Sequence, residues 1–193
     1  MCLPQPANET IMTDSPTTIM TADEMATALD ALAQAIAQAH PGADTIYLLG
    51  VLRRGRPLAD HLAQRIEALS GVTCKVGSLA TTLYRDDVRT GSAVPKIGGE
   101  DTHFDFDVDG QSIVLVDDVL NSGRTIRAAM DAIMDYGRPA RIQLACLIDR
   151  GLREVPIQAD YLGKSIQTNP EDHVRVKLHE LDGEDSVTLT QPE

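Results

Sequence analysis

The sequence predicts an α/β fold in which helices flank a central, mainly parallel sheet. Short, nearly continuous apolar runs are typical of strands buried on both faces of such a sheet, and they occur at residues 45–51, 112–116 and 141–148. Segments with helical apolar spacing alternate with them, at residues 24–39, 57–69 and 124–136. Because alternating strands and helices form parallel βαβ units, we expect ligands at the carboxyl ends of the strands.

The first predicted helix carries signals at both of its ends. Thr21-x-x-Glu24 reads as a capping box, and the segment His40-Pro41-Gly42 ends the helix. One apolar face is formed between them by Met25, Leu29, Leu32 and Ile36. The second helix is followed by Gly71 and turns four side chains inward: Leu58, Leu62, Ile66 and Leu69.

The middle of the chain predicts a further strand and a long loop. Residues 72–84 are rich in Val, Thr and Leu and should pair into the sheet. Residues 85–102 are polar and rich in glycine, and their length is typical of a mobile functional loop.

The two ends of the chain differ from its centre. Residues 173–178 and 186–190 alternate in polarity around Asp182-Gly183, which predicts a C-terminal β-hairpin. Residues 1–20 have no apolar periodicity, so we expect a disordered leader, with Met12 and Met20 as alternative starts. Residues 21–193 then form a single domain.

Composition excludes several classes of protein. Seventeen basic and 29 acidic residues give a net charge of −12, which argues against broad, nonspecific binding of nucleic acid. The apolar runs are far too short to span a membrane and the N-terminus is not a secretory signal, so we expect a cytoplasmic protein. Neither the three cysteines nor the five histidines have metal-ligand spacing.

The segment IVLVDDVLNSGRT, residues 113–125, carries the clearest chemistry. Asp117 and Asp118 accept hydrogen bonds when ionised, which suits the two hydroxyls of a ribose 2′,3′-diol. The amides of residues 121–125, the helix dipole and the hydroxyls of Ser122 and Thr125 suit a terminal phosphate. The alternatives for the acid pair are a cap for the next helix and a metal site.

This segment resembles the PRPP-binding motif of type I phosphoribosyltransferases, where PRPP is phosphoribosyl pyrophosphate. Its surroundings resemble the PyrR family, which combines uracil phosphoribosyltransferase activity with pyrimidine-operon attenuation. The resemblance covers residues 24–180 and rests on LLGVLRRG (48–55), TLYRDD (82–87), SIVLVDDVLNSGRTIRAAMDAIMDYGRP (112–139) and IQLACLIDRGLREVPIQADYLGKSIQT (142–168). It implies the type I phosphoribosyltransferase fold, with a small hood, and a dimer or higher homo-oligomer.

The resemblance also implies a reaction and a set of site residues. The enzyme, a pentosyltransferase, would convert uracil and PRPP to UMP and pyrophosphate, with Mg²⁺ carried by PRPP rather than by a protein cage. Catalysis would rest on Asp117, Asp118 and Arg85, and pyrophosphate would meet Arg54 and Arg85. PRPP and nucleotide would contact Arg54, Asp117, Asp118, Val119, Leu120, Asn121, Ser122, Gly123, Arg124 and Thr125.

The base pocket would lie under a hood built from Asp149-Arg150 and residues 160–168, with Asp149 and Ile166 near the pyrimidine. Asn121 departs from the family, whose uracil-type members usually carry tyrosine there, while several purine-specific relatives carry an acid. Since an amide cannot act as a base, purine transfer is disfavoured and slow uracil turnover is expected.

The regulatory half of the resemblance is less well supported by the residues. Helix 24–39 contains no Lys, Arg or His, although relatives use basic residues there to bind RNA. The remaining candidates for leader RNA are Arg138, Arg150, Arg153 and Lys164. Three functions therefore stay open: uracil salvage, UMP-responsive RNA binding with weak catalysis, and phosphoribosyl transfer to another base.

Overall fold

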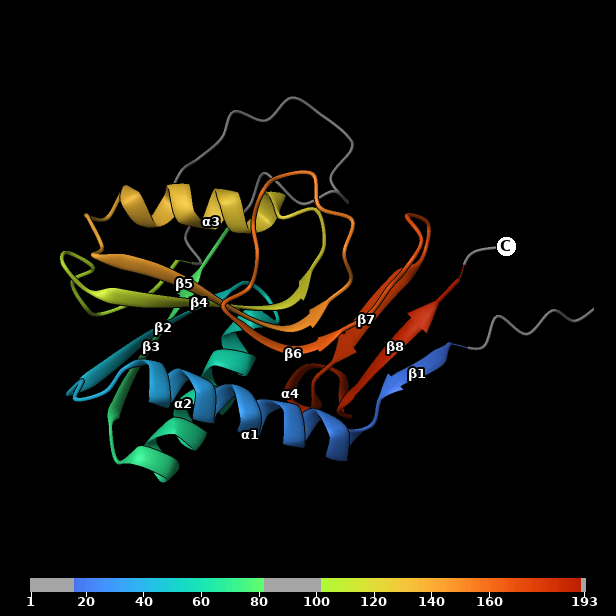
Figure 1. The fold of residues 1–193 in the computed structure, drawn as a ribbon, viewed down its shortest axis with the longest axis horizontal. Helices are drawn as coiled ribbons and strands as arrows, with labels where there is room; N and C mark the ends of the chain where they lie inside the picture. The colour runs from blue at the N-terminus through green and yellow to red at the C-terminus, as the bar shows by residue number, and fades with distance from the viewer. Residues whose placement is uncertain (1–15, 82–101, 192–193) are drawn as a thin grey trace, which may run out of the picture.

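A five-stranded parallel sheet forms the centre of the protein in the computed structural model, which describes residues 16–81 and 102–191 (Figure 1). Its strands are β2 (Thr45–Val51), β3 (Thr73–Leu79), β4 (Ser112–Leu120), β5 (Arg141–Asp149) and β6 (Tyr161–Ser165). They lie in the order β3-β2-β4-β5-β6, and every neighbouring pair is parallel. This arrangement confirms the predicted α/β architecture.

Helices cover both faces of this sheet. The helices α1 (Ala22–Ala39) and α2 (Gly55–Ser70) lie on one face, and α3 (Arg124–Met134) lies on the other (Figure 1). Successive residues of β2 point to opposite faces. Leu48 packs in the apolar cluster that contains α1 and α2, whereas Leu49 packs in the cluster that contains α3. The continuous apolar run in β2 therefore has one core on each side.

The predicted capping box at the start of α1 is present. The amide of Glu24 donates to Thr21 Oγ1 at 3.3 Å, and the amide of Thr21 donates to Glu24 Oε2 at 2.8 Å. Two of the amides that a helix start leaves without an intrahelical partner are thus satisfied.

A second, antiparallel sheet has the strand order β1-β8-β7. It consists of β1 (Thr17–Met20), β7 (His173–Lys177) and β8 (Ser186–Thr190), and the short helix α4 (His179–Asp182) connects β7 to β8. The predicted C-terminal hairpin is confirmed. Its connection is a helical turn ended by Gly183 rather than a tight turn, and Gly183 has a φ of 78°.

The prediction of a disordered leader over residues 1–20 is wrong for its last four residues. Residues 17–20 pair with β8, and the Met20 side chain is 3% exposed within the α1 and α2 core. A four-residue strand is too short to show periodicity, and its partner is remote in sequence. Residues 1–15 lie outside the described residues.

Several boundaries also differ from the predictions. The strand expected over 72–84 ends at Leu79, and residues 82–101, including most of the predicted loop and Arg85, lie outside the described residues. Residues 161–165, expected in a hood, form the edge strand β6 of the main sheet. The strand expected to end at Val116 continues to Leu120, so the acid pair belongs to β4 itself.

Within residues 16–81 and 102–191, no helix has both the length and the apolarity that crossing a membrane requires.

Candidate active site

A polar cavity lies where the winding of the sheet changes direction. β2 has β3 on one side and β4 on the other, so the chain adds β3 and then returns across β2 to form β4. Parallel α/β sheets bind ligands outside the strand ends at such a switch point. Here the cavity measures about 170 Å³ and is lined by Val51, Leu52, Arg53, Arg54, Asp117, Asp118, Val119 and Thr125.

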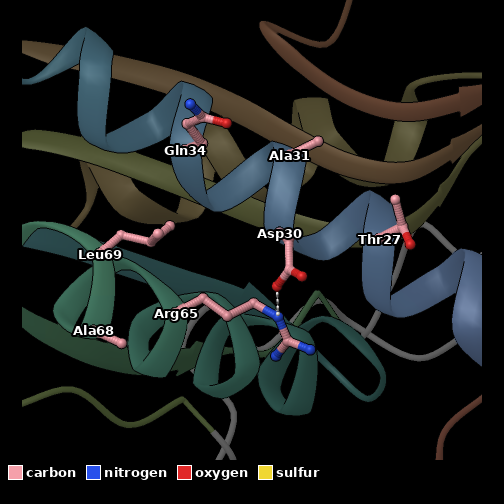
Figure 2. Close-up of a pocket in the computed structure, with 7 residues that line it drawn as sticks. All are labelled: Thr27, Asp30, Ala31, Gln34, Arg65, Ala68 and Leu69. Atoms are coloured by element: carbon pink, nitrogen blue, oxygen red, sulfur yellow. Dashed lines mark hydrogen bonds and ion pairs between the residues drawn. The ribbon is translucent and has the colours of Figure 1, made fainter.

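A larger hollow of about 500 Å³ lies between α1 and α2 and has a different character (Figure 2). Its lining residues are Thr27, Asp30, Ala31, Gln34, Arg65, Ala68 and Leu69. Arg65 Nε donates to Asp30 Oδ1 at 2.8 Å, so the two charged side chains that line this hollow pair with each other. Because this hollow gathers no acid pair and no helix start, the cavity at the strand ends is the candidate site.

The turn after β2 packs closely against β4. A Cβ atom on Gly55 would lie 2.2 Å from the carbonyl oxygen of Val116, so only glycine fits there. The peptide bond between Leu52 and Arg53 is cis. This close approach brings the two arginines of the turn to the cavity that Asp117 and Asp118 line from β4.

The acid pair ends β4 with its carboxylates anchored to the backbone. Asp117 Oδ1 accepts a hydrogen bond from the Asp118 amide at 3.0 Å, and Asp118 Oδ1 accepts one from the Val119 amide at 3.0 Å. Burial raises the pKa of the Asp118 carboxyl, against the opposing effects of its hydrogen bonds and of the Arg54 charge. The half-buried Asp118 is therefore placed where a donor or a cation from a ligand would favour its ionised form.

The alternatives for the acid pair gain no support from this geometry. The N-cap residue of α3 is Gly123, and among the described residues no side chain makes an N-cap hydrogen bond at this helix, which begins beside the pair. Among the described residues, no group of three or more His, Cys, Asp or Glu side chains could hold a metal ion.

The turn between β4 and α3 leaves the start of that helix open. Gly123 has a φ of 87°, a conformation that favours glycine, and a Cβ atom there would lie 2.8 Å from Val155 Cγ2. Ser122 is buried, and its Oγ accepts a hydrogen bond from the Arg124 amide at 3.3 Å. Thr125 lines the cavity. An uncapped helix start beside a cavity is suited to an anion.

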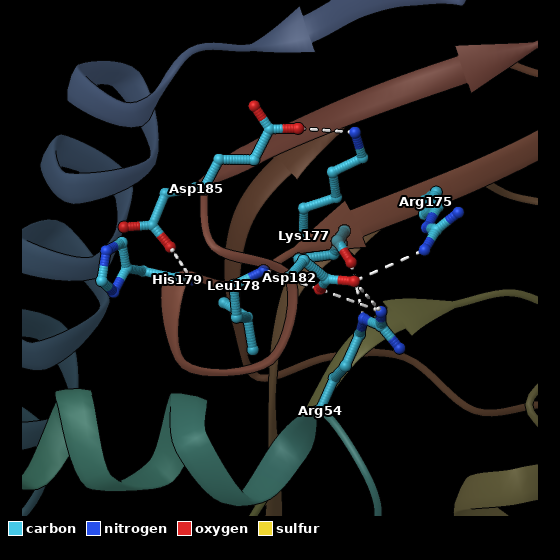
Figure 3. A network of polar contacts seen from close by, with 9 residues as sticks. Arg54, Arg175, Lys177, Leu178, His179, Asp182 and Asp185 are labelled. Atoms are coloured by element: carbon cyan, nitrogen blue, oxygen red, sulfur yellow. Dashed lines mark hydrogen bonds and ion pairs between the residues drawn. The ribbon is translucent and has the colours of Figure 1, made fainter.

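Arg54 is held on one edge by the antiparallel sheet (Figure 3). Its Nε donates to the Val176 carbonyl at 2.6 Å, and its Nη2 lies 3.0 Å from both carboxylate oxygens of Asp182. Arg53, by contrast, is exposed and also lines the cavity, and its side chain has no hydrogen bond or ion pair to the described residues. Sequence reasoning chose Arg54 and missed Arg53, although the pair of arginines in LRRG was a visible signal.

The structure brings the two predicted base-binding residues together but not into the cavity. The Ile166 amide donates to the Asp149 carbonyl at 2.8 Å, and Asp149 lies opposite Leu120 in the register of β4 and β5. The Asp149 carboxylate accepts from the Gly151 amide at 2.8 Å and pairs with Arg153. Neither Asp149 nor Ile166 lines the cavity, although both lie at the same end of the sheet.

Comparison with known proteins decides the family. Residues 17–181 match the family described as phosphoribosyl transferase domain. A protein named Bifunctional protein PyrR from Deinococcus deserti is 49% identical over 172 residues, which cover 89% of this chain and 93% of that protein. Its namesake from Deinococcus radiodurans is 47% identical over 182 residues, covering 94% and 98%. This chain belongs to the PyrR family of phosphoribosyltransferases.

A solved structure supports the fold of this PyrR family member. The hypoxanthine phosphoribosyltransferase of Trypanosoma cruzi superposes with a TM-score of 0.69 and covers 93% of this chain and 99% of its own. The identity is 18%, so this likeness concerns the fold alone.

In this PyrR family member, most of the predicted RNA-binding cations are engaged internally. Arg150 is buried and donates to Thr168 Oγ1 at 3.0 Å and to the Asn169 carbonyl at 2.8 Å. Lys164 donates to the Ile19 carbonyl at 2.8 Å. Arg153 donates to several carbonyl groups and to Asp149. Arg138 is exposed, and its side chain has no hydrogen bond or ion pair to the described residues, whereas its amide donates to Asp109 Oδ1 and its carbonyl accepts from the Gly110 amide at 2.9 Å.

Asn121 is the first residue of the turn between β4 and α3, and one of its side-chain atoms has no hydrogen-bond partner among the described residues. Its Oδ1 is buried and has no hydrogen-bond partner in the described residues. The carbonyl oxygen of Asn121 accepts from Arg153 Nη1 at 2.6 Å, which fixes the backbone of this residue. An unpaired buried acceptor is costly in free energy, so this oxygen is an exception among the buried polar atoms of the described residues.

Proposed function

We propose that this protein transfers the phosphoribosyl group of PRPP to N1 of uracil, giving UMP and pyrophosphate. One observation carries the proposal: an anchored acid pair and an uncapped helix start line one polar cavity, in a chain of the PyrR family. The acids suit the sugar diol and the helix start suits the 5′-phosphate, so both ends of a ribose phosphate have partners.

In this proposal, the turn of residues 121–125 binds the 5′-phosphate. Amides at the start of α3 donate to phosphate oxygens, and the hydroxyls of Ser122 and Thr125 add donors. Asp117 and Asp118 accept from the ribose hydroxyls and disperse positive charge as the bond from C1 to pyrophosphate breaks. Uracil N1 then attacks C1 within a substrate held at both ends, and the proton of N1 passes to an oxygen of the departing pyrophosphate.

The pyrophosphate end would meet the arginines of the turn after β2. Arg53 is exposed at the cavity, and Arg54 Nη1 has no partner in the part of the chain that the structure describes, while Nε and Nη2 are bound to Val176 and Asp182. Arg85, the other arginine that the resemblance assigns to pyrophosphate, lies outside the described residues. Cations aimed at the leaving group stabilise the charge that develops there.

Mg²⁺ fits this site as a companion of PRPP rather than as a resident ion. Among its described lining residues, the cavity offers only the carboxylates of Asp117 and Asp118, whereas Mg²⁺ prefers six oxygen ligands and keeps several waters. PRPP oxygens would supply most of the shell. The bound ion neutralises charge on pyrophosphate.

The base would lie beyond the sugar, toward Asp149 and Ile166. Their backbones meet at the carboxyl ends of β5 and β6, where the Ile166 amide donates to the Asp149 carbonyl, and the pyrimidine would lie against this end of the two strands. Asn121 offers an amide rather than a carboxylate near the base, which suits a neutral pyrimidine better than deprotonation of a purine.

Product analysis with a panel of bases tests this function. Wild-type protein with PRPP and Mg²⁺ should form UMP from uracil and little product from hypoxanthine, guanine or orotate. The Asp118→Asn variant should lose most of this activity. Nucleotide formation from a purine in preference to uracil would contradict the substrate, and unchanged activity in Asp118→Asn would contradict the site.

A second function, UMP-responsive binding of pyrimidine-operon leader RNA, is favoured by the name of the relatives. Of the predicted RNA contacts, α1 has no basic residue, Arg150 is buried, and Arg153 and the exposed Lys164 already donate to backbone carbonyls. Filter binding of leader RNA at fixed salt, with and without UMP, decides the matter. Retention that does not respond to UMP would exclude this function.

A dimer or higher homo-oligomer is part of the same proposal, and analytical ultracentrifugation measures the oligomeric state.

A further inference from the structure

Two side chains of the short helix α4 pair with residues in the first two turns of α2, and these pairs link the antiparallel sheet to α2. Asp182 binds Arg54, which occupies the N-cap position of α2. Glu180 Oε1 lies 2.6 Å from His61 Nε2 in the second turn of the same helix. Both carboxylates come from one helical turn at the end of the β7 strand. The C-terminal hairpin therefore has a direct connection to the turn that lines the candidate site.

Asp182 is fixed from several directions (Figure 3). Its Oδ2 accepts a hydrogen bond from the Leu178 amide at 3.1 Å, and both of its oxygens lie 3.0 Å from Arg54 Nη2. Arg175 Nη2 is a weaker partner at 3.4 Å. The side chain of Asp182 is only 12% exposed, so solvent screens its pair with Arg54 less than it screens a surface pair. The Leu178 hydrogen bond, opposed in part by burial and aided by Arg54, lowers the pKa of Asp182.

These contacts also fix which edge of Arg54 is available. A planar guanidinium has five donors in a rigid fork. Nε is taken by the Val176 carbonyl and Nη2 by Asp182, while Nη1 has no partner among the described residues. Because the guanidinium is rigid, holding one edge determines where the Nη1 donors point. Arg54 lines the cavity, and its charge partly opposes the burial that raises the pKa of Asp118.

We propose that Asp182 is a positioning residue that holds Arg54 in place to bind the pyrophosphate group of the substrate. This inference rests on the proposed phosphoribosyltransferase function and adds a residue from outside the cavity, on the C-terminal hairpin, to it. Asp182 does not touch the substrate. It prevents the Arg54 side chain from sampling other rotamers. Arg54 therefore loses this conformational entropy when the protein folds and not when the substrate binds.

Ligands with and without pyrophosphate test this role. The Asp182→Asn variant should bind PRPP and pyrophosphate on the order of tenfold more weakly, because Arg54 loses its charged anchor. Binding of UMP, which has the same 5′-phosphate and ribose but no pyrophosphate, should stay within about twofold of wild type. In steady state, KM for PRPP should rise while KM for uracil stays unchanged. Titration calorimetry with each ligand separates these expectations.

A matched control lies in the same turn. Glu184 pairs with Lys177 at 2.6 Å and has no contact with Arg54. The Glu184→Gln variant removes a carboxylate from the hairpin and should leave PRPP, pyrophosphate and UMP binding unchanged. An Arg54→Gln background supplies the second control. There, Asp182→Asn should have no further effect on PRPP binding, because the residue through which it acts is absent.

The outcomes separate this role from others. Equal weakening of PRPP and UMP would mean that Asp182 only supports the fold, and unchanged PRPP binding would mean that Arg54 needs no anchor; either result overturns the inference. If Asp182→Asn does not fold, Asp182→Glu, which keeps the charge with a longer stem, is judged by the same ratio of PRPP to UMP affinity. If wild-type protein binds neither ligand, the proposed function itself fails.

Discussion

Arg153 Nη1 lies 2.6 Å from the carbonyl oxygen of Asn121, at the start of the turn that opens α3. The same atom donates to the Gly151 carbonyl at 3.0 Å, Nε donates to the Ile157 carbonyl at 2.8 Å, and Nη2 pairs with Asp149. One side chain thus joins the proposed phosphate turn to the loop that follows β5. A residue that sequence analysis assigned to RNA is, in the structure, a connector inside the site.

The Arg153→Lys variant should lose stability and nucleotide affinity together. Lysine keeps the charge but has a single ammonium group, which cannot reach the same set of carbonyls. We expect roughly 1–3 kcal/mol less free energy of unfolding, as for an unsatisfied buried polar group. Urea denaturation and UMP titration measure both effects. The exposed Arg138→Gln variant is the control and should change neither; equal effects in both variants would contradict the connector role.

The Asp118→Asn variant should be more stable than wild type at neutral pH while binding PRPP poorly. Burial raises the pKa of Asp118, so the folded protein disfavours the ionised form. Wild-type stability should therefore fall as pH rises from the ordinary aspartate range through the raised folded-state pKa. Asparagine has no charge to bury, so the variant should lack this decline.

Urea denaturation of both proteins at acidic and at mildly alkaline pH checks this expectation. The exposed Asp131→Asn variant on α3 is the control, and it should follow wild type at every pH. A variant that loses stability at alkaline pH as steeply as wild type would contradict the burial argument.

The Gly123→Ala variant should lose both stability and UMP binding. An alanine Cβ would lie 2.8 Å from Val155 Cγ2 in addition to having an unfavourable φ of 87°. We expect a loss on the order of 1–3 kcal/mol, together with a displaced turn. Gly42 is the matched control, since its φ is 73° and nothing lies within 4 Å of an added Cβ. Gly42→Ala should cost only the backbone strain and leave UMP affinity intact.

Cys74 should react slowly with thiol reagents in the folded protein. Burial, with a further contribution from the nearby Glu67, raises the pKa of its thiol to about 12. At pH 8 the reactive thiolate is then about one part in ten thousand. Alkylation of a Cys2→Ser variant by iodoacetamide, followed by peptide mass analysis, should label Cys74 far faster in urea than in buffer. Rapid labelling at pH 8 without denaturant would show that the thiol is accessible and ionised.

The local features of the sequence anticipated much of the fold because they depend on neighbours in the chain. The Thr21 and Glu24 capping box, the helical apolar face of α1 and the buried runs of β2, β4 and β5 all use short spacings. The glycine and acid pattern of residues 117–125 likewise encodes a strand end, a turn and a helix start. These segments form as predicted, with boundaries shifted by a few residues.

The errors share a different cause. β1 forms only because β8, far along the chain, supplies its backbone partners, and β6 joins the main sheet only because β5 offers a free edge. Burial of Arg150 and the contacts of Arg153 and Lys164 also depend on loops that meet only in the folded chain. The local sequence does not show the partners of these three side chains, and their assignment to RNA stays a prediction.

By itself, the sequence determined the central α/β architecture, the acid pair and the helix start at the candidate site, because local propensity and short-range spacing specify such features. Tertiary structure alone decided which arginine is free and which is held: Arg53 and Arg54 are adjacent and chemically identical, yet only Arg54 lies within reach of Asp182. Pairing between residues that are remote in the chain is set by packing, and no local pattern records it.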